Sequence, residues 1–263
     1  MPEGHTIHRA ARDQRKRLAG RPVAVSSPQG RFSAQAAVLD GRVLRGIDAV
    51  GKHLFYDWGD GLWVHVHLGL FGRFRYHVGD PPPPRDTTRL RMTSGDDTVD
   101  LSGATICALI DEGAREAILA RLGPDPLRGD DPTPFLERVA RTPAPVAAVL
   151  MDQSAIAGIG NVYRCEALYV NGLYPFTPGR ALTPDQARAL WDTCAAFLAV
   201  GVRTGRTLTV DPVEFGTTRS RLGARRKNYV YRRQTCLRCG APVRSEPFRG
   251  RTLHWCPACQ PAP

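Results

Sequence analysis

The sequence has no apolar stretch that approaches the length of a membrane span, and its first residues lack the apolar core of a secretory signal. It also contains no internal repeat. Four of its seven cysteines have the spacing of metal ligands, and the other three, Cys107, Cys165 and Cys194, are scattered, which is unlike a disulfide framework. We therefore expect a protein of the reducing cytoplasm that has no membrane partner.

Acidic residues are fewer than basic residues in this sequence. The 263 residues carry 36 Lys and Arg against 25 Asp and Glu, which gives a formal net charge of +11. An excess of this size favours a polyanionic partner, most often nucleic acid, because cationic side chains neutralise phosphates and release their counterions. Composition alone also allows that the positive balance only aids solubility. A chain of this length fits one large or two small domains with a substantial core.

The first half of the chain is predicted to be one helix followed by short strands. Residues 7–18 place apolar side chains on one helical face, and Gly20 ends the pattern. From residue 22 to 110 short β-like runs alternate with glycine turns, and the prolines of 81–84 predict an exposed loop between two strands. Such regular strands favour a β-sandwich. The clearest strand patterns lie at 43–47, 53–58 and 62–67.

The second half of the chain is predicted to be helical, because the strand pattern stops after Leu127. Its composition changes several times, which sets the expected order of elements. That order is a linker with one short helix (128–145), a helix (146–151), a turn (157–160), a helix that Asn161 begins, a helix with a capping box at 183–186, and a mobile basic loop (203–228).

The C-terminal segment has a strong metal-binding pattern. Two Cys-x2-Cys knuckles, separated by the length of a hairpin, supply four thiolates in the number that tetrahedral zinc prefers. Four protein ligands leave no open coordination position, so we predict one structural Zn²⁺. The hairpin between the knuckles also carries Arg249, Arg251 and His254, which the metal would present to a phosphate unless they are simply solvated. The predicted ligands are Cys236, Cys239, Cys256 and Cys259.

The chain begins Met1-Pro2-Glu3-Gly4. Methionine is normally trimmed before a residue as small as proline, which leaves a secondary amine at the N-terminus. Attack of such an amine on a sugar C1′ gives a cationic iminium, an electron sink that acidifies the neighbouring carbon and promotes strand cleavage by elimination. A helix that follows would keep more of the amine in its nucleophilic form. By itself, Pro2 is more simply explained as a signal for methionine removal at a floppy terminus.

Three other positions each allow two interpretations. Glu3 beside the amine is either a general acid or a carboxylate that favours the helix start. Lys52, in a turn before a strand, either contacts phosphate and moves protons or is solvated. Asn161 most simply caps the helix that it begins, although a helix N-terminus after a glycine turn is also an anion site.

Two further pairs stand near strand ends. His65 and His67 alternate on one strand, and without a third ligand nearby they are packing or phosphate-contacting groups rather than a metal site. Leu70 and Phe71 follow a strand end, where they either join the core or form an exposed apolar tip. Such a tip would fill the hole that an extruded base leaves in a duplex.

Taken together, these residues resemble the formamidopyrimidine-DNA glycosylase/endonuclease VIII family over essentially the whole chain. Gly4, where the formamidopyrimidine branch usually has Leu, favours the endonuclease VIII branch. The chain departs from well-known members of that branch at Gly69, where they have glutamine, and residues 203–228 match neither branch well. The matching motifs, in family order, are Pro2-Glu3-Gly4, Gly51-Lys52, 67–72, 121–125, 150–153, 158–163, 229–232 and 251–260.

The resemblance implies a role for each matched residue. Pro2 would be the Schiff-base nucleophile and Glu3 the general acid and base at the sugar. Lys52 would assist β-elimination, and Arg251 would bind phosphate and assist δ-elimination. The DNA-binding residues would be Asn161, which holds the backbone near the lesion, Arg121, the intercalating wedge Leu70, and its neighbour Phe71.

The sequence thus predicts an α+β protein: an N-terminal β-sandwich with a leading α-helix (1–125), a linker (126–144), a helix–two-turn–helix domain (145–228) and a C-terminal zinc-finger β-hairpin (229–263). We expect a monomeric, bacterial, nucleoid-associated DNA N-glycosylase and AP lyase that acts on damaged double-stranded DNA, removes oxidised bases with pyrimidines favoured, and cleaves by β,δ-elimination. The alternatives are an oxidised-purine glycosylase of the same family and a non-enzymatic zinc-containing DNA-binding relative.

Overall fold

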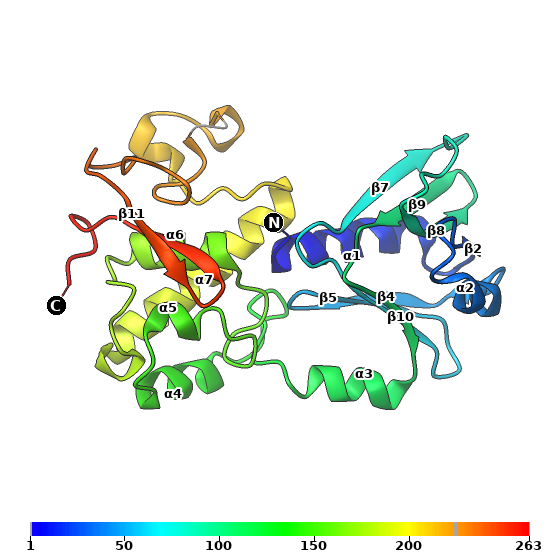
Figure 1. Cartoon of the computed structure of the whole chain (residues 1–263), viewed down its shortest axis with the longest axis horizontal. Coiled ribbons are helices and arrows are strands. Elements are labelled where there is room, and N and C mark those ends of the chain that lie inside the picture. Colours follow the sequence, from blue (N-terminus) through cyan, green and yellow to red (C-terminus); the bar gives the residue numbers. More distant parts are fainter. Residues whose placement is uncertain (1, 224–225, 263) are drawn as a thin grey trace. The chain divides into compact units, whose positions relative to one another are not determined.

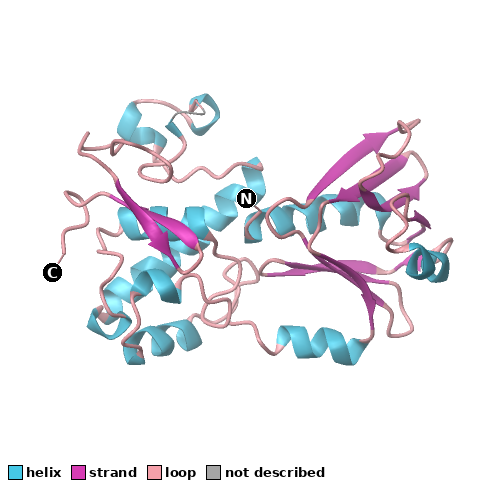
Figure 2. Cartoon of the chain, viewed as in Figure 1, coloured by secondary structure: helices cyan, strands magenta, loops and turns pink. Residues whose placement is uncertain are grey.

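The computed structural model describes residues 2–223 and 226–262. The chain divides into two compact units, Met1–Arg121 and Leu122–Pro263 (Figure 1). Most of the described strands belong to the first unit and most of the described helices to the second (Figure 2). The α+β prediction is therefore confirmed, whereas the finer division into four parts stays a prediction. None of the described helices is long and apolar enough to cross a membrane.

The first unit contains three helices and ten strands among its described residues. The helices are α1 (Gly4–Leu18), α2 (Ser33–Leu39) and α3 (Glu112–Leu119). The strands are β1 (Arg21–Pro22), β2 (Ala24–Ser26), β3 (Val43–Leu44), β4 (Gly46–Val50), β5 (His53–Asp57), β6 (Trp63–His67), β7 (Arg73–Val78), β8 (Thr88–Ser94), β9 (Asp97–Ser102) and β10 (Ile106–Ile110).

Two antiparallel four-stranded sheets form this unit, with the strand orders β10-β6-β5-β4 and β2-β8-β9-β7, and β1 pairs with β3 beside them. α1 lies between the sheets, in contact with β4 and β5 of one and β8 and β9 of the other (Figure 1). Its buried positions Ile7, Ala10, Ala11 and Leu18 recur with helical spacing, as predicted. The proline run lies in the loop between β7 and β8, so that prediction is also confirmed.

The second unit is built mainly from helices. They are α4 (Thr133–Arg141), α5 (Val146–Val149), α6 (Asn161–Val170) and α7 (Pro184–Thr204), with 3-10 turns η1 (Gly179–Ala181), η2 (Pro212–Phe215) and η3 (Arg219–Arg221). The hairpin strands are β11 (Arg244–Phe248) and β12 (Arg251–Trp255).

Local sequence explains where α7 begins and ends. The Thr183 hydroxyl accepts from the Gln186 backbone N–H at 3.2 Å, and the Thr183 N–H donates to the Gln186 side chain at 2.9 Å, which forms the predicted capping box. Gly205, at a φ of 67°, ends the helix in the left-handed conformation that glycine adopts at low cost. α7 therefore runs into the segment predicted as loop, and the η2 and η3 turns occupy part of the remainder.

Candidate active site and cysteine centre

The described chain starts at the N-terminal end of α1. Glu3 occupies the N-cap position through its backbone, since its carbonyl accepts from the Thr6 N–H at 2.9 Å, and its side chain makes no capping hydrogen bond. That side chain is completely buried, while Pro2 beside it is partly exposed. A buried carboxyl next to an accessible imino acid at the positive end of a helix dipole suits proton transfer better than capping.

Lys52 and the Leu70–Phe71 segment leave the first sheet at the same end. Lys52 lies in the turn between β4 and β5, and residues 68–72 follow β6 directly. His53, the first residue of β5, lies opposite His67, the last residue of β6. The turn before β5 and the loop after β6 therefore lie side by side. Lys52, Leu70 and Phe71, which the sequence suggested separately, are at the same end of the sheet.

Three histidines lie on one face of this sheet end. The Nδ1 of His53 is 2.9 Å from the Nε2 of His65, and the two rings stack with their centroids 5.1 Å apart. The ring of His67 is 5.1 Å from that of His53. His53 was missed in the sequence because only the strand register sets it opposite His67.

Burial keeps these histidines uncharged. It is the main cause that lowers the pKa of His53 to about 3 and the pKa of His65 to about 4. Burial and then the Lys52 ammonium lower the pKa of His67, and the Arg121 charge adds to the lowering at His53, so both cations lie near the cluster. The His67 Nδ1 accepts from the Gly69 N–H at 3.2 Å, which leaves its proton on Nε2 as a donor for an anion.

The 68–72 loop presents apolar side chains to solvent. Phe71 is 82% exposed and Leu70 is 43% exposed, so the predicted apolar tip is observed. Gly69 has a φ of 64°, and a Cβ there would lie 1.9 Å from the Thr105 hydroxyl oxygen. A side chain at position 69 would therefore strain the backbone and displace Thr105, which accounts for the glycine found there.

In the second unit, Asn161 does not cap α6, so the predicted capping role is wrong. Gly160 is the N-cap residue, and the Asn161 side chain is buried. Its amide nitrogen donates to the Thr252 carbonyl at 2.8 Å, and its oxygen accepts from Arg164. The expectation failed because β12 reaches Asn161 from far along the chain. One N–H of the amide is left for a further acceptor.

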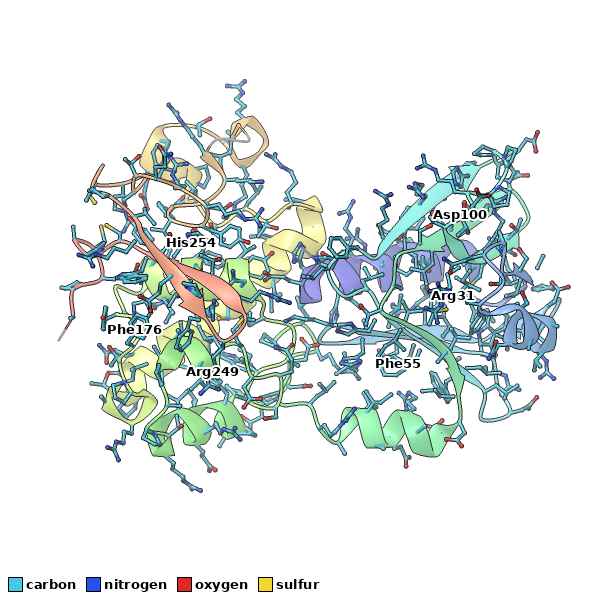
Figure 3. All side chains as sticks on the ribbon, in the orientation of Figure 1. Arg31, Phe55, Asp100, Phe176, Arg249 and His254 are labelled. Atoms are coloured by element: carbon cyan, nitrogen blue, oxygen red, sulfur yellow. The ribbon has the colours of Figure 1, made fainter. Side chains whose placement is uncertain are left out.

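The same contact brings Asn161 next to Arg251, since Thr252 is the neighbouring residue. Arg251 starts β12 directly after a two-residue hairpin turn, Arg249 and Gly250, both at positive φ. Figure 3 labels Arg249 at the tip of this hairpin. The His254 N–H donates to the Cys165 sulfur at 3.4 Å, so α6 holds the hairpin at two points.

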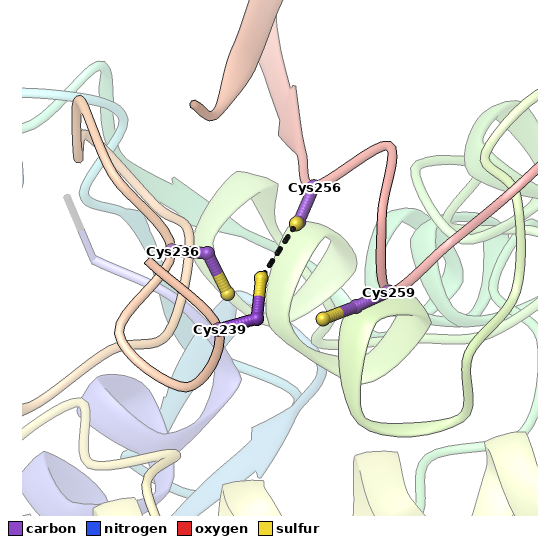
Figure 4. A group of neighbouring side chains, drawn as sticks. All are labelled: Cys236, Cys239, Cys256 and Cys259. Carbon is purple, nitrogen blue, oxygen red and sulfur yellow. Dashed lines mark hydrogen bonds between the residues drawn. The ribbon is translucent and has the colours of Figure 1, made fainter. Parts of the chain in front are cut away.

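The four predicted cysteines form one group (Figure 4). Their sulfurs all lie within 4.8 Å of one another, and those of Cys239 and Cys256 are 3.5 Å apart. Tetrahedral zinc with Zn–S bonds of about 2.3 Å separates its sulfurs by about 3.8 Å, so the group fits this metal. The Tyr169 hydroxyl lies 3.1 Å from the Cys236 sulfur and 3.6 Å from that of Cys259, which supplies an outer hydrogen bond.

Sequence reasoning missed Glu166, whose completely buried carboxylate organises this unit. It accepts from the Thr209 hydroxyl at 2.6 Å and from three consecutive backbone N–H groups, those of residues 229–231, at 2.7–2.9 Å. Burial raises the pKa of Glu166, and these four donors oppose the rise. Glu166 lies within an apolar stretch of α6, and a carboxylate there was the available signal.

Two family models match the chain. Residues 1–103 match the formamidopyrimidine-DNA glycosylase N-terminal domain, and residues 122–212 match the formamidopyrimidine-DNA glycosylase H2TH domain. The chain is 45% identical over 267 aligned positions to the protein named Endonuclease 8 1 of Mycobacterium bovis, with 99% of this chain and 100% of that protein covered.

More distant relatives carry the other name. The formamidopyrimidine-DNA glycosylase of Geotalea uraniireducens is 32% identical over 232 positions, which cover 85% of this chain and 84% of that protein. The solved complex of Lactococcus lactis Fpg with DNA that contains an abasic site has a TM-score of 0.81 at 23% identity, with 99% of this chain and 100% of that chain covered. That structural likeness shows a shared fold.

Proposed function

The chain belongs to the formamidopyrimidine-DNA glycosylase/endonuclease VIII family and is a DNA glycosylase with AP lyase activity, and we propose that the amine of Pro2 is its nucleophile. The observation that carries the proposal is the completely buried Glu3 beside Pro2 at the N-terminal end of α1. The carboxyl stands next to the amine whose reaction needs a proton donor and acceptor, and the helix dipole disfavours the ammonium form of that amine.

The proposed chemistry passes through a covalent iminium. The Pro2 nitrogen attacks C1′ of the damaged nucleoside while the C1′–N bond to the base breaks, and the base leaves with the proton that the amine loses. Glu3 then protonates the sugar ring oxygen as the nitrogen lone pair forms the iminium and the C1′–O bond breaks, which opens the ring. The resulting iminium acidifies C2′. Loss of a C2′ proton expels the 3′ phosphate (β-elimination), and loss of a further proton from C4′ expels the 5′ phosphate (δ-elimination). Water then releases the sugar fragment and regenerates the amine.

Lys52 and Arg251 are the proposed helpers in elimination. Lys52 lies near the uncharged His53 and His67, so its ammonium supplies positive charge at that end of the sheet and can assist β-elimination. Arg251 follows the rigid hairpin turn and can hold the phosphate that leaves in δ-elimination. Its position depends on the hairpin contacts with α6.

The remaining matched residues are proposed to hold DNA. Leu70 and Phe71 are exposed apolar groups at a tight loop, as a wedge in a base stack requires. Arg121 is an exposed cation near the histidine cluster, and Asn161 keeps one amide N–H for a backbone phosphate. Zinc on the four cysteines would neutralise the thiolates and fix the hairpin that carries Arg251.

Oxidised pyrimidines are the proposed preferred lesions. The higher and longer identity to proteins named Endonuclease 8 1 than to those named formamidopyrimidine-DNA glycosylase supports the endonuclease VIII branch. Excision assays on duplexes with thymine glycol, dihydrouracil, 8-oxoguanine or an abasic site test this preference. Faster excision of 8-oxoguanine than of either pyrimidine would favour the purine alternative.

Borohydride trapping tests the nucleophile. The protein should begin at Pro2 by mass analysis and form a reducible adduct with an abasic-site duplex. Pro2→Gly should largely abolish trapping or move it to another amine while the fold and the metal content survive. Glu3→Gln should reduce base excision more than abasic-site cleavage, because proton transfer matters most as the base departs. Retention of Met1 in active protein, or trapping by Pro2→Gly as in the unmodified chain, would show that another group attacks.

A further inference from the structure

The outer face of the sheet β2-β8-β9-β7 carries a row of arginines with no assigned role. β7 is the edge strand of this sheet, and its neighbour is β9. Arg75 lies opposite Asp100, which lies opposite Arg91, and Arg73 lies opposite Ser102. Residues that face one another across antiparallel strands share a face, so these side chains stand together. Tyr76 contacts α1 through Gln14, which places the core on the other face.

The one carboxylate at the centre of this group is already occupied. Asp100 accepts from the Nε and Nη2 atoms of Arg91 at 2.7 and 2.8 Å and lies 3.2 Å from the Nε2 of His77. Asp100 is 4% exposed, and Figure 3 labels it beside β7 and β9. Hydrogen bonds and charge from Arg91 and His77 outweigh burial and hold the pKa of Asp100 below its usual range. It therefore has little capacity left for another cation.

Three neighbouring arginines have no such partner within the described residues. Neither Arg73, Arg75 nor Arg85 forms an ion pair or a side-chain hydrogen bond there, although Asp80 and Asp86 lie in the same β7–β8 connection as Arg85. The pKa of Arg75 is lowered, first by desolvation and then by the charges of Arg85 and Arg73, while the charge of Asp100 opposes the lowering. The three cations are therefore within electrostatic range of one another. Asp100 offsets only part of this repulsion, because it is already paired with Arg91, so the three cations favour an anionic partner.

One further feature extends this surface. Phe71, the most exposed large apolar side chain of the loop before β7, precedes Arg73 by two residues. Guanidinium groups that can donate in pairs and a nearby exposed aromatic ring match the chemistry of a DNA backbone and its bases.

We propose that Arg73, Arg75 and Arg85 form an accessory DNA surface that binds phosphates of duplex flanking the lesion. DNA is favoured over an acidic protein because it is the partner of this enzyme, and phosphate accepts the paired N–H groups of arginine. The surface adds sequence-independent affinity and the ability to slide along DNA. It does not depend on the identity of the nucleophile.

The test measures binding of a long undamaged duplex as a function of salt. The triple change Arg73→Ser, Arg75→Ser and Arg85→Ser is compared with Arg31→Ser, Arg42→Ser and Arg45→Ser, which removes the same charge from exposed positions of the same unit. In a plot of the logarithm of the binding constant against the logarithm of salt concentration, each lost phosphate contact should make the slope less negative by about 0.9. For three contacts the change should be about 2.7, and we expect it in the first variant alone. Arg75→Lys should keep most of the slope, and circular dichroism should show both triple variants folded.

The outcomes separate the explanations. Equal flattening in both triple variants would mean that net charge, not this face, binds DNA, and no flattening in the first variant would overturn the proposal in favour of another partner such as an acidic protein. If the first triple variant is unfolded, the single changes Arg73→Ser and Arg85→Ser replace it, with about 0.9 of slope expected for each. Borohydride trapping in the unmodified chain reports on Pro2 independently of this result.

Discussion

The cores of the two units differ in the polar groups that they contain. Between the sheets of the first unit the Tyr56 hydroxyl donates to the neutral Gln14 side chain at 2.7 Å, and on the other face of β6 burial keeps His65 uncharged. The second unit instead buries the Glu166 carboxyl among four donors and gathers four cysteine thiols. Neutral groups pair at low desolvation cost, whereas a buried ionisable group is costly to desolvate and depends on every one of its partners. The two units should therefore fail under different conditions.

The largest expected effect is loss of the metal. Structural zinc supplies on the order of 10 kcal/mol of binding free energy, so chelation should unfold the hairpin that the cysteines close. Hydrogen exchange followed by mass spectrometry should show loss of protection in peptides from residues 236–259 and no change in peptides from 46–67. Cys256→Ser should act in the same direction. Uniform exchange across both units would contradict the contrast between them.

Removal of the Glu166 carboxylate should come next. Glu166→Gln replaces one acceptor oxygen by an N–H donor that faces backbone N–H groups, which leaves at least one of them unpaired. We expect a loss of about 3 kcal/mol in the free energy of unfolding, measured by urea denaturation. Glu137→Gln is the matched control, because Glu137 is exposed and its one ion pair, with Arg141 at 3.7 Å in i,i+4 spacing, is weak. This change should lower the free energy of unfolding by about 0.5 kcal/mol or less. Equal losses of unfolding free energy in the two variants would mean that the buried Glu166 carboxylate does not hold these segments together.

The sequence predicted some features of this protein and not others. Local signals predicted α1, the capping box of α7, the proline loop and the cysteine spacing, because each depends on residues close together in the chain. The capping interpretation of Asn161 is wrong, and Glu166 has no local signal of its role, because their partners, Thr252 and residues 209–231, are dozens of positions away. His53 joined the cluster only through strand register. Long-range pairing, not local propensity, decides the roles of such residues.

Acid should weaken the first unit through its neutral histidines. The folded-state pKa of His65 is about 4, below the 6.5 of an unfolded chain, so the unfolded state binds more protons between these values. Stability therefore falls as the pH drops from 6.5 towards 4, by up to about 3 kcal/mol for this group. His65→Phe keeps the ring and should reduce that acid sensitivity, as judged by hydrogen exchange of peptides from 46–67 at about pH 7 and about pH 4.5. The same acid-induced loss in both proteins would rule out His65 as a cause.

The smallest effect on stability is expected at Phe71. This residue can be compared with Phe74 nearby, to separate a role in DNA binding from a role in the fold. Phe71 is 82% exposed, whereas Phe74, three residues later in β7, packs against the core of the first unit. Phe71→Ala should change the free energy of unfolding by less than about 0.5 kcal/mol, because it removes few contacts, while Phe74→Ala should cost about 2 kcal/mol.

If Phe71 enters the base stack, its change should still weaken binding of a lesion duplex by about tenfold, or about 1.4 kcal/mol. Urea denaturation and fluorescence anisotropy with the same two variants measure both quantities. A Phe71→Ala protein that binds the lesion duplex as tightly as the unmodified chain would show that this ring is merely solvent-exposed and that Leu70 alone forms the wedge.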